Sequence, residues 1–82
     1  MSVKESVRQF ITTNFYVPDA SKLADEASLL DQGIIDSTGV LELVGFLESE
    51  YGIQLADDEI VAENLDSIAA IVGFVGRKKA AS

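Results

Sequence analysis

The chain has 82 residues, enough for one domain and near the lower limit for burying a core without disulfides or metal ions. It contains no cysteine and no histidine, which excludes disulfide bonds, thiolate nucleophiles, histidine acid–base pairs and the common zinc sites. The net charge is −8, and Leu23 to Gly76 holds twelve acidic residues and no basic one, which disfavours nucleic acid as a partner and favours basic proteins.

The first predicted helix covers residues 1–16. Its apolar residues recur three and four positions apart, the spacing that builds one face of an amphipathic helix. Ser2 followed by Glu5 matches a capping box and marks the start, and Pro18 marks the end. The residues of the apolar face are Val3, Val7, Phe10, Ile11 and Phe15.

Residues 17–35 form a long predicted connection. A tethered loop of this length in so short a chain is usually functional. Apolar residues are spread along it, and we expect them to hold the segment against the core. These residues are Leu23, Leu29, Leu30, Ile34 and Ile35.

The second predicted helix covers residues 36–51 and begins at Asp36 or Ser37. Gly52 follows it as a left-handed C-terminal cap. Gly39 and Gly45 each destabilise the isolated helix by about 1 kcal/mol relative to alanine, so packing against the rest of the chain must stabilise it. Its buried stripe is expected to consist of Val40, Leu43, Val44, Leu47 and Tyr51.

Two further helical segments complete the prediction. A short helix covers residues 57–62, where an acidic first turn suits the helix dipole, and a last helix covers 65–76, capped near Asn64. Residues 77–82 are expected to form a frayed tail. The predicted fold is all-α, a small four-helix bundle of three longer helices and one short one in a single domain, with a long loop between the first two helices. The inward residues of the last helix are Leu65, Ile68, Ile71, Val72 and Val75.

No segment of the sequence has the pattern of a targeting or membrane-spanning element. The N-terminus lacks the apolar stretch of a signal peptide, and the longest apolar run, Ile68 to Val75, is far too short to cross a bilayer. We therefore expect a cytoplasmic protein. We also expect it to be a monomer.

The segment GIIDSTGVLEL, from Gly33 to Leu43, is the candidate site. Asp36 and Ser37 lie where the extended loop turns into a helix, so the serine hydroxyl should be exposed beside unpaired backbone amides. An anion joined there, such as a phosphodiester, would meet the positive end of the helix. A simple helix cap is the alternative interpretation of an Asp–Ser pair at this place.

The stretch from Leu29 to Ile53 closely resembles the phosphopantetheine attachment region of acyl and peptidyl carrier proteins. The attachment motif of that family is Asp–Ser followed by an apolar residue and preceded closely by glycine, and Gly33, Asp36 and Ser37 match it. The predicted helices also fall where the family has them, so the resemblance covers nearly the whole chain. The Gly-Ile-Ile-Asp-Ser form is similar to that of discrete carriers such as the D-alanyl carrier protein.

The resemblance implies a discrete acyl or aminoacyl carrier protein with no catalytic activity of its own. Ser37 would bear 4′-phosphopantetheine, moved from coenzyme A by a separate phosphopantetheinyl transferase, and the thiol of this arm would hold the cargo as a thioester. Asp36 would belong to the motif and cap the helix. The family mostly has Leu or Met where this chain has Thr38, a departure that affects the choice of partner enzymes rather than the modification.

The resemblance also implies partners that dock on the acidic surface. They are the transferase, an acyl or aminoacyl ligase, and downstream synthase or transferase enzymes with basic patches. The form of the motif favours an aminoacyl or short acyl cargo in a specialised biosynthetic pathway. For any single acidic residue, a solvated helix face is the alternative interpretation. The residues expected to dock are Thr38, Glu42, Glu48, Asp57, Asp58 and Glu59.

Other interpretations of the sequence account for less of it. A non-catalytic acidic helical interaction module explains the charges but not the pattern from Gly33 to Ser37. A calcium loop over residues 57–68 lacks a ligand and the central glycine, so no metal site is expected. A second pair, Asp66 and Ser67, lacks the preceding glycine and the long loop. Room for an acyl chain between the helices is less favoured than close packing at the small residues Gly39, Ala62, Ala69 and Gly73.

Overall fold

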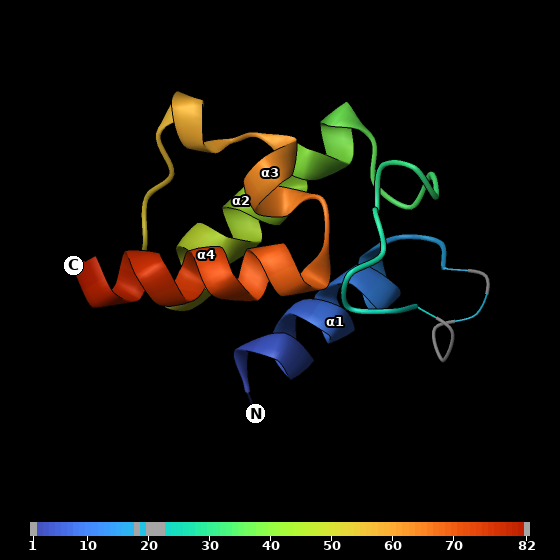
Figure 1. Cartoon of the computed structure of the whole chain (residues 1–82), viewed down its shortest axis with the longest axis horizontal. Helices are drawn as coiled ribbons and strands as arrows, with labels where there is room; N and C mark the ends of the chain where they lie inside the picture. The colour runs from blue at the N-terminus through green and yellow to red at the C-terminus, as the bar shows by residue number, and fades with distance from the viewer. Residues whose placement is uncertain (1, 18, 20–22, 82) are drawn as a thin grey trace.

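The computed structural model describes residues 2–17, 19 and 23–81, and these residues form helices joined by loops (Figure 1). No β-strand occurs among them, which confirms the predicted all-α fold class. Within these ranges, the helices lack the length and hydrophobicity that a membrane span requires. Pro18, predicted to end the first helix, lies outside the described residues. The elements are α1 (Val3–Asn14), α2 (Ser37–Tyr51), the short 3₁₀ helix η2 (Asp57–Glu59), α3 (Ala62–Leu65) and α4 (Ile68–Ala81).

The other helices are arranged around α4. This helix contacts α1, α2 and α3. Figure 1 shows it running across the molecule, with α1 on one side and α3 on the other. The long connection between α1 and α2 lies at one end of the bundle and leads into the first turn of α2. The candidate site therefore lies at an end of the bundle.

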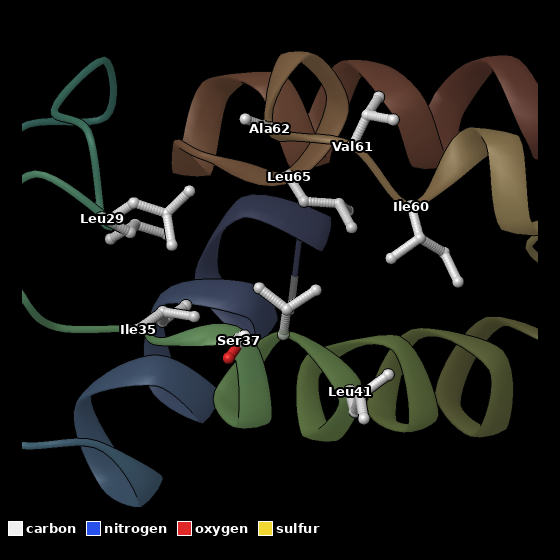
Figure 2. Close-up of a pocket in the computed structure, with 10 residues that line it drawn as sticks. Leu29, Ile35, Ser37, Leu41, Ile60, Val61, Ala62 and Leu65 are labelled. Atoms are coloured by element: carbon white, nitrogen blue, oxygen red, sulfur yellow. The ribbon is translucent and has the colours of Figure 1, made fainter.

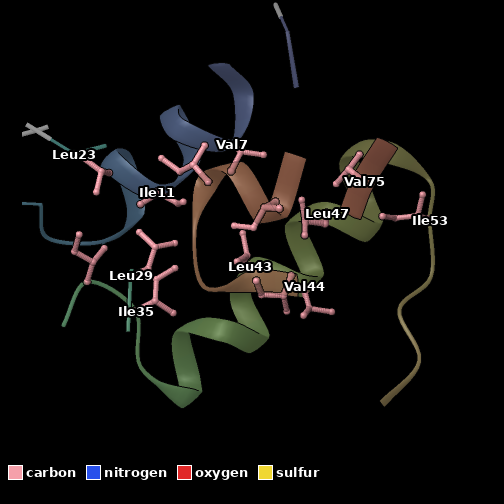
Figure 3. Close-up of a cluster of buried hydrophobic side chains, with 14 residues drawn as sticks. Val7, Ile11, Leu23, Leu29, Ile35, Leu43, Val44, Leu47, Ile53 and Val75 are labelled. Atoms are coloured by element: carbon pink, nitrogen blue, oxygen red, sulfur yellow. The ribbon is translucent and has the colours of Figure 1, made fainter. Parts of the chain in front are cut away.

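Apolar residues from α1, α2, α4 and the long connection form the core (Figure 3). Val7 and Ile11 of α1 are fully buried, as are Leu43 and Leu47 of α2, which confirms the predicted inward faces of both helices. Leu30, predicted to anchor the connection, is instead 40% exposed. The other predicted anchors are buried, namely Leu23, Leu29, Ile34 and Ile35. The core also includes Ile68, Ile71 and Val75 of α4.

The ends of α1 and α2 carry the expected capping residues. The Ser2 hydroxyl oxygen accepts a hydrogen bond from the Glu5 amide at 3.1 Å, which satisfies one of the free amides of the first turn. Gly52 caps α2 in the left-handed conformation with φ 65°. Helix α1 ends at Asn14, two residues before its predicted end at 16, because the backbone of Phe15 is extended.

The segment predicted as one short helix over residues 57–62 is two separate elements, η2 and α3. The backbone at Ile60 and Val61, between them, is not helical, with ψ of 72° and 157°. The Asn64 side chain donates a hydrogen bond to the Glu59 carbonyl oxygen at 3.0 Å. Asn64 therefore belongs to α3 and joins it to η2, and the prediction that it caps the last helix is wrong.

The last helix begins and ends later than its predicted range of 65–76. Its first turn is capped by the Ser67 hydroxyl oxygen, which accepts from the Ala70 amide at 3.0 Å. The prediction of a frayed tail over residues 77–82 is also wrong, since α4 continues to Ala81. Lys78 lies 3.0 Å from the Glu59 carboxylate, and basic residues in a last turn suit the helix dipole.

Ion pairs hold the long connection against α1. The Asp25 carboxylate lies 2.7 Å from the Lys4 ammonium and 2.6 Å from the Arg8 guanidinium. Arg8 also donates a hydrogen bond to the Leu23 carbonyl oxygen at 2.8 Å. Its guanidinium thus joins the side chain of one loop residue and the backbone of another, which fixes the start of the described loop on α1.

Acid is expected to weaken this attachment. The hydrogen bonds from Lys4 and Arg8 hold the pKa of Asp25 below its ordinary value, so the folded state favours the carboxylate. The contribution of Asp25 to the free energy of unfolding should be complete above about pH 4, the ordinary aspartate pKa, and lost as pH falls through the lower pKa of the folded state. Urea unfolding of the wild type and Asp25→Asn between pH 7 and pH 2 measures this contribution. The variant should be the less stable at pH 7, and the difference should shrink below about pH 4. A difference that stays constant over the whole range would contradict the ion-pair account.

Candidate functional site

Ser37 is the first residue of α2 and is exposed. Asp36, just before it, caps the helix: its Oδ1 accepts from the Gly39 amide at 2.7 Å, and its backbone oxygen accepts from the Val40 amide at 2.9 Å. The Ser37 hydroxyl makes no hydrogen bond within the part of the chain that the structure describes. Because Asp36 provides the cap, the hydroxyl of Ser37 is left available for chemistry.

The approach to Ser37 is set by a tight turn. Gly33 has a φ of +70°, a left-handed backbone conformation that residues other than glycine rarely adopt. Its amide donates to the Leu30 carbonyl oxygen at 3.0 Å. Ile34 and Ile35 follow and are buried. The turn and these two anchors bring the chain to the start of α2 in a fixed direction.

The first turn of α2 also packs closely against the end of α1. A Cβ atom built on Gly39 would lie 2.8 Å from a ring carbon of Phe15 and 3.3 Å from the capping Oδ1 of Asp36. Real Cβ atoms essentially never approach another atom that closely. Glycine at position 39 therefore allows Phe15 to contact the turn that carries Ser37.

An apolar pocket of about 340 Å³ opens beside Ser37. Figure 2 shows Ser37 and Leu41 of α2 on one side of it, with Val61, Ala62 and Leu65 across from them. Ser37 contributes the one polar side chain among the described residues that line it. The other lining residues are Leu29, Leu30, Ile35, Val40 and Ile60.

Three large apolar side chains at this pocket are exposed. Leu41 is 65% exposed, Val61 41% and Leu30 40%. Leu41 lies outside the predicted inward stripe of α2. A large apolar residue off that stripe is the sequence signal that could have identified Leu41 as an exposed residue of the site. Apolar groups left exposed around one opening are typical of a surface that binds a ligand or another protein.

Most of the small residues that the sequence suggested as room for an acyl chain lie outside the pocket. Of these, Ala62 lines it, whereas Gly39 is buried against Phe15. Ala69 and Gly73 are exposed on α4. The close packing that the sequence favoured is therefore found at Gly39, and the pocket is formed by branched side chains from separate segments.

The residues expected to dock partners differ in their surroundings. Glu42, Asp57 and Asp58 are exposed, as is Thr38 beside Ser37. Glu48, by contrast, is half-buried, and its carboxylate accepts from the Leu55 amide at 2.9 Å.

Glu59 is also engaged within the molecule. Its carboxylate accepts from the Ala56 amide at 2.9 Å and lies 3.0 Å from the Lys78 ammonium. The Ala56 amide, and secondly Lys78, hold the pKa of Glu59 below its ordinary value. Glu48 and Glu59 therefore hold the backbone around η2, which the sequence did not indicate.

Asp66 belongs to the second Asp–Ser pair of the sequence, and it bonds to the residues of the long connection that line the pocket. Its carboxylate accepts from the Ser28 hydroxyl at 2.6 Å and from the Leu30 amide at 2.9 Å, and its backbone oxygen accepts from the Leu29 amide at 2.6 Å. Ser67 caps α4. Both members of this pair thus have structural partners, in contrast to the free hydroxyl of Ser37.

The structure contains no arrangement suited to a metal ion in the residues that it describes. No group of three or more acidic side chains there is placed to hold one. The acidic cluster at residues 57–59 forms η2, in which Glu59 is turned toward Ala56 and Lys78.

Known proteins match almost the whole chain. Residues 5–75 match the family described as phosphopantetheine attachment site, a range that includes Asp36 and Ser37. The chain is also 29% identical over 79 residues to an acyl carrier protein from Solidesulfovibrio magneticus, and the aligned region covers 96% of this chain and 97% of that protein.

Proposed function

Since the chain belongs to the phosphopantetheine attachment family, we propose that Ser37 is its attachment residue. The chain is a non-catalytic carrier whose cofactor is covalently bound 4′-phosphopantetheine. We also propose that its cargo is an uncharged acyl group. The observation that carries this proposal is the position of Ser37, whose free, exposed hydroxyl lies at the start of α2 and at the edge of an apolar pocket. We further propose that it works as a monomer in the cytoplasm.

The surroundings of Ser37 suit a phosphodiester. The amides of Ser37 and Thr38 have no acceptor within α2, because the first amides of a helix point out of its end. The positive end of the helix dipole stabilises a nearby anion by about 0.3–1 kcal/mol at an exposed site. The chain has no histidine to accept the proton of the Ser37 hydroxyl. A separate transferase would therefore provide the base that removes it, and the bound arm would supply a thiol for the cargo thioester.

The lining of the pocket favours an aliphatic cargo. Apart from Ser37, the described lining residues are all apolar, so the ammonium group of an aminoacyl cargo would lose its hydration there without gaining a partner. The volume of about 340 Å³ lies near the lower end of small-molecule sites, which are about 300–1,000 Å³. These properties support a short or medium-length acyl chain over the aminoacyl alternative.

Exposed residues on α2 and η2 and at the rim of the pocket support a docking surface for several enzymes. Glu42, Asp57 and Asp58 provide negative charge, and Leu41 and Val61 provide apolar contact. A partner with a basic patch beside an apolar one would match this surface, and charge steering would speed its encounter with the carrier. The proposed partners are the phosphopantetheinyl transferase, an acyl ligase and the enzymes that use the acyl group.

Loading the arm with two different cargoes tests the proposal. A broad-specificity transferase would attach either the hexanoyl arm from hexanoyl-coenzyme A or the alanyl arm from alanyl-coenzyme A. Methyl NMR would then follow Val40, Leu41 and Leu65. The hexanoyl form should shift these methyl signals relative to the unloaded arm, whereas the alanyl form should leave them nearly unchanged, because only the aliphatic group is compatible with the pocket.

Two further samples make this experiment decisive. Ser37→Ala, which lacks the acceptor hydroxyl, should take up neither cargo and show no shift. Methyl groups of Val7 and Ile11, buried core residues that do not line the pocket, serve as an internal control. Equal shifts from the alanyl form, or none from the hexanoyl form, would contradict an acyl cargo held in the pocket.

A further inference from the structure

Two walls of the pocket come from segments far apart in the sequence. One wall is Leu29 and Leu30, from the long connection, and another is Ala62 and Leu65, from α3. Asp66 directly follows α3 and bonds to the first wall. Its backbone and side chain thus connect the two walls.

The connection consists of three hydrogen bonds that Asp66 accepts. The Asp66 carboxylate accepts from the Leu30 amide at 2.9 Å and from the Ser28 hydroxyl at 2.6 Å, and the Asp66 backbone oxygen accepts from the Leu29 amide at 2.6 Å. Hydrogen bonds to a carboxylate are shorter and stronger than those between neutral groups. Ser28 in turn accepts from the Asp31 amide at 3.1 Å, which extends the network through the turn before Gly33.

On the solvent side, hydrogen bonds fix this wall more than burial does; besides Asp66, the Gly33 amide donates to the Leu30 carbonyl oxygen at 3.0 Å. Leu29 is buried, but Leu30 is 40% exposed, so hydrophobic burial alone holds Leu30 only in part. A side chain with so much surface in water loses less by moving than a core residue does. The Gly33 bond stays within the local turn, so the bonds of Asp66 fix where Leu30 lies relative to α3.

We propose that Asp66 is a positioning residue of the pocket. By fixing Leu29 and Leu30 relative to α3, it sets the width of the opening beside Ser37 and keeps the pocket formed when no cargo is bound. This inference rests on the proposed function for its biological meaning, because the pocket matters to a carrier as the place that receives the cargo. The geometry itself does not depend on attachment at Ser37.

Amide hydrogen exchange on the unmodified chain tests the bonds directly. Asp66→Ala should speed exchange of the Leu30 amide by about tenfold or more, because the carboxylate bond is lost. Asp66→Asn keeps an oxygen that can accept from this amide and should restore much of the protection. Glu63→Ala removes an exposed acidic side chain of α3 and should change nothing at Leu30.

Binding of 1-hexanol, followed by methyl NMR of Leu29, Val40 and Leu65, tests the consequence for the pocket. The wild type should bind this short aliphatic probe in the pocket, Asp66→Ala should bind it severalfold more weakly, and Asp66→Asn should recover. Ser67→Ala, which removes the cap of α4 one residue away, serves as a variant of reduced stability that leaves both walls bonded.

The outcomes separate positioning from general destabilisation. If Asp66→Ala binds hexanol as well as the wild type does, or if Ser67→Ala weakens binding as much, the proposal is overturned. A failure of the transferase to modify Ser37 would overturn the proposed function and leave these two measurements, which need no arm, unaffected.

Discussion

Replacing Gly39 by alanine is expected to destabilise the chain relative to replacing Gly45 by alanine, although both glycines lie inside α2. A Cβ at position 39 would lie 2.8 Å from the Phe15 ring, whereas a Cβ at position 45 would meet nothing within 4 Å. Both substitutions gain the same helix propensity, about 1 kcal/mol. The difference in unfolding free energy between the variants is therefore the cost of overpacking at position 39, about 1–3 kcal/mol.

The Phe15 ring has little freedom to relieve this contact. It packs edge-on against Phe10, with ring centroids 5.9 Å apart, and Phe10 stacks on Phe46 at 4.2 Å. Moving Phe15 would disturb this aromatic group. The added Cβ would also lie 3.3 Å from both the Asp36 Oδ1 and the Ile35 side chain, so a shift of these groups would displace the start of α2. The substitution at Gly39 should therefore also disturb the surroundings of Ser37.

Thermal unfolding of the two variants measures the difference. For a domain of this size, 1 kcal/mol corresponds to about 4–8 °C in Tm, so Gly39→Ala should melt at least about 4 °C below Gly45→Ala. Near-equal melting temperatures would show that the Phe15 ring moves at little energetic cost to accommodate the added Cβ. Glycine at position 39 would then not be required for the packing of this turn.

The predicted faces of α1 and α2 agree with the structure because local rules determine them. Apolar residues at helical spacing must turn inward, and Ser2 and Gly52 have the side chain or backbone freedom that helix ends require. The free hydroxyl of Ser37 follows from the same local chemistry, since Asp36 is the better placed residue to cap the helix. Features that depend on neighbouring residues can thus be predicted from the amino-acid sequence alone.

The features that the sequence did not reveal depend on distant contacts. Helix α4 continues past its predicted end where Lys78 reaches Glu59, nineteen positions away, and Asp66 bonds to the turn at Ser28, thirty-eight positions away. The pocket likewise combines side chains from the long connection, α2 and α3. Periodicity and capping patterns describe single segments, so they cannot show which segments meet.

Ser37→Ala is expected to abolish attachment of the arm completely, because it removes the hydroxyl oxygen proposed to form the bond to the arm. Ser67→Ala is the matched control, since Ser67 also follows an aspartate at the start of a helix, but its hydroxyl is engaged in capping that helix. Circular dichroism of both variants should show that they remain folded, since Ser37 is exposed and makes no hydrogen bond with the described residues.

The intact mass of the unmodified chain after incubation with coenzyme A and a broad-specificity phosphopantetheinyl transferase tests the assignment most directly. The wild type and Ser67→Ala should each gain the mass of a single phosphopantetheine arm, and Ser37→Ala should gain none. Addition of the arm to Ser37→Ala, or its loss in Ser67→Ala alone, would contradict attachment at Ser37.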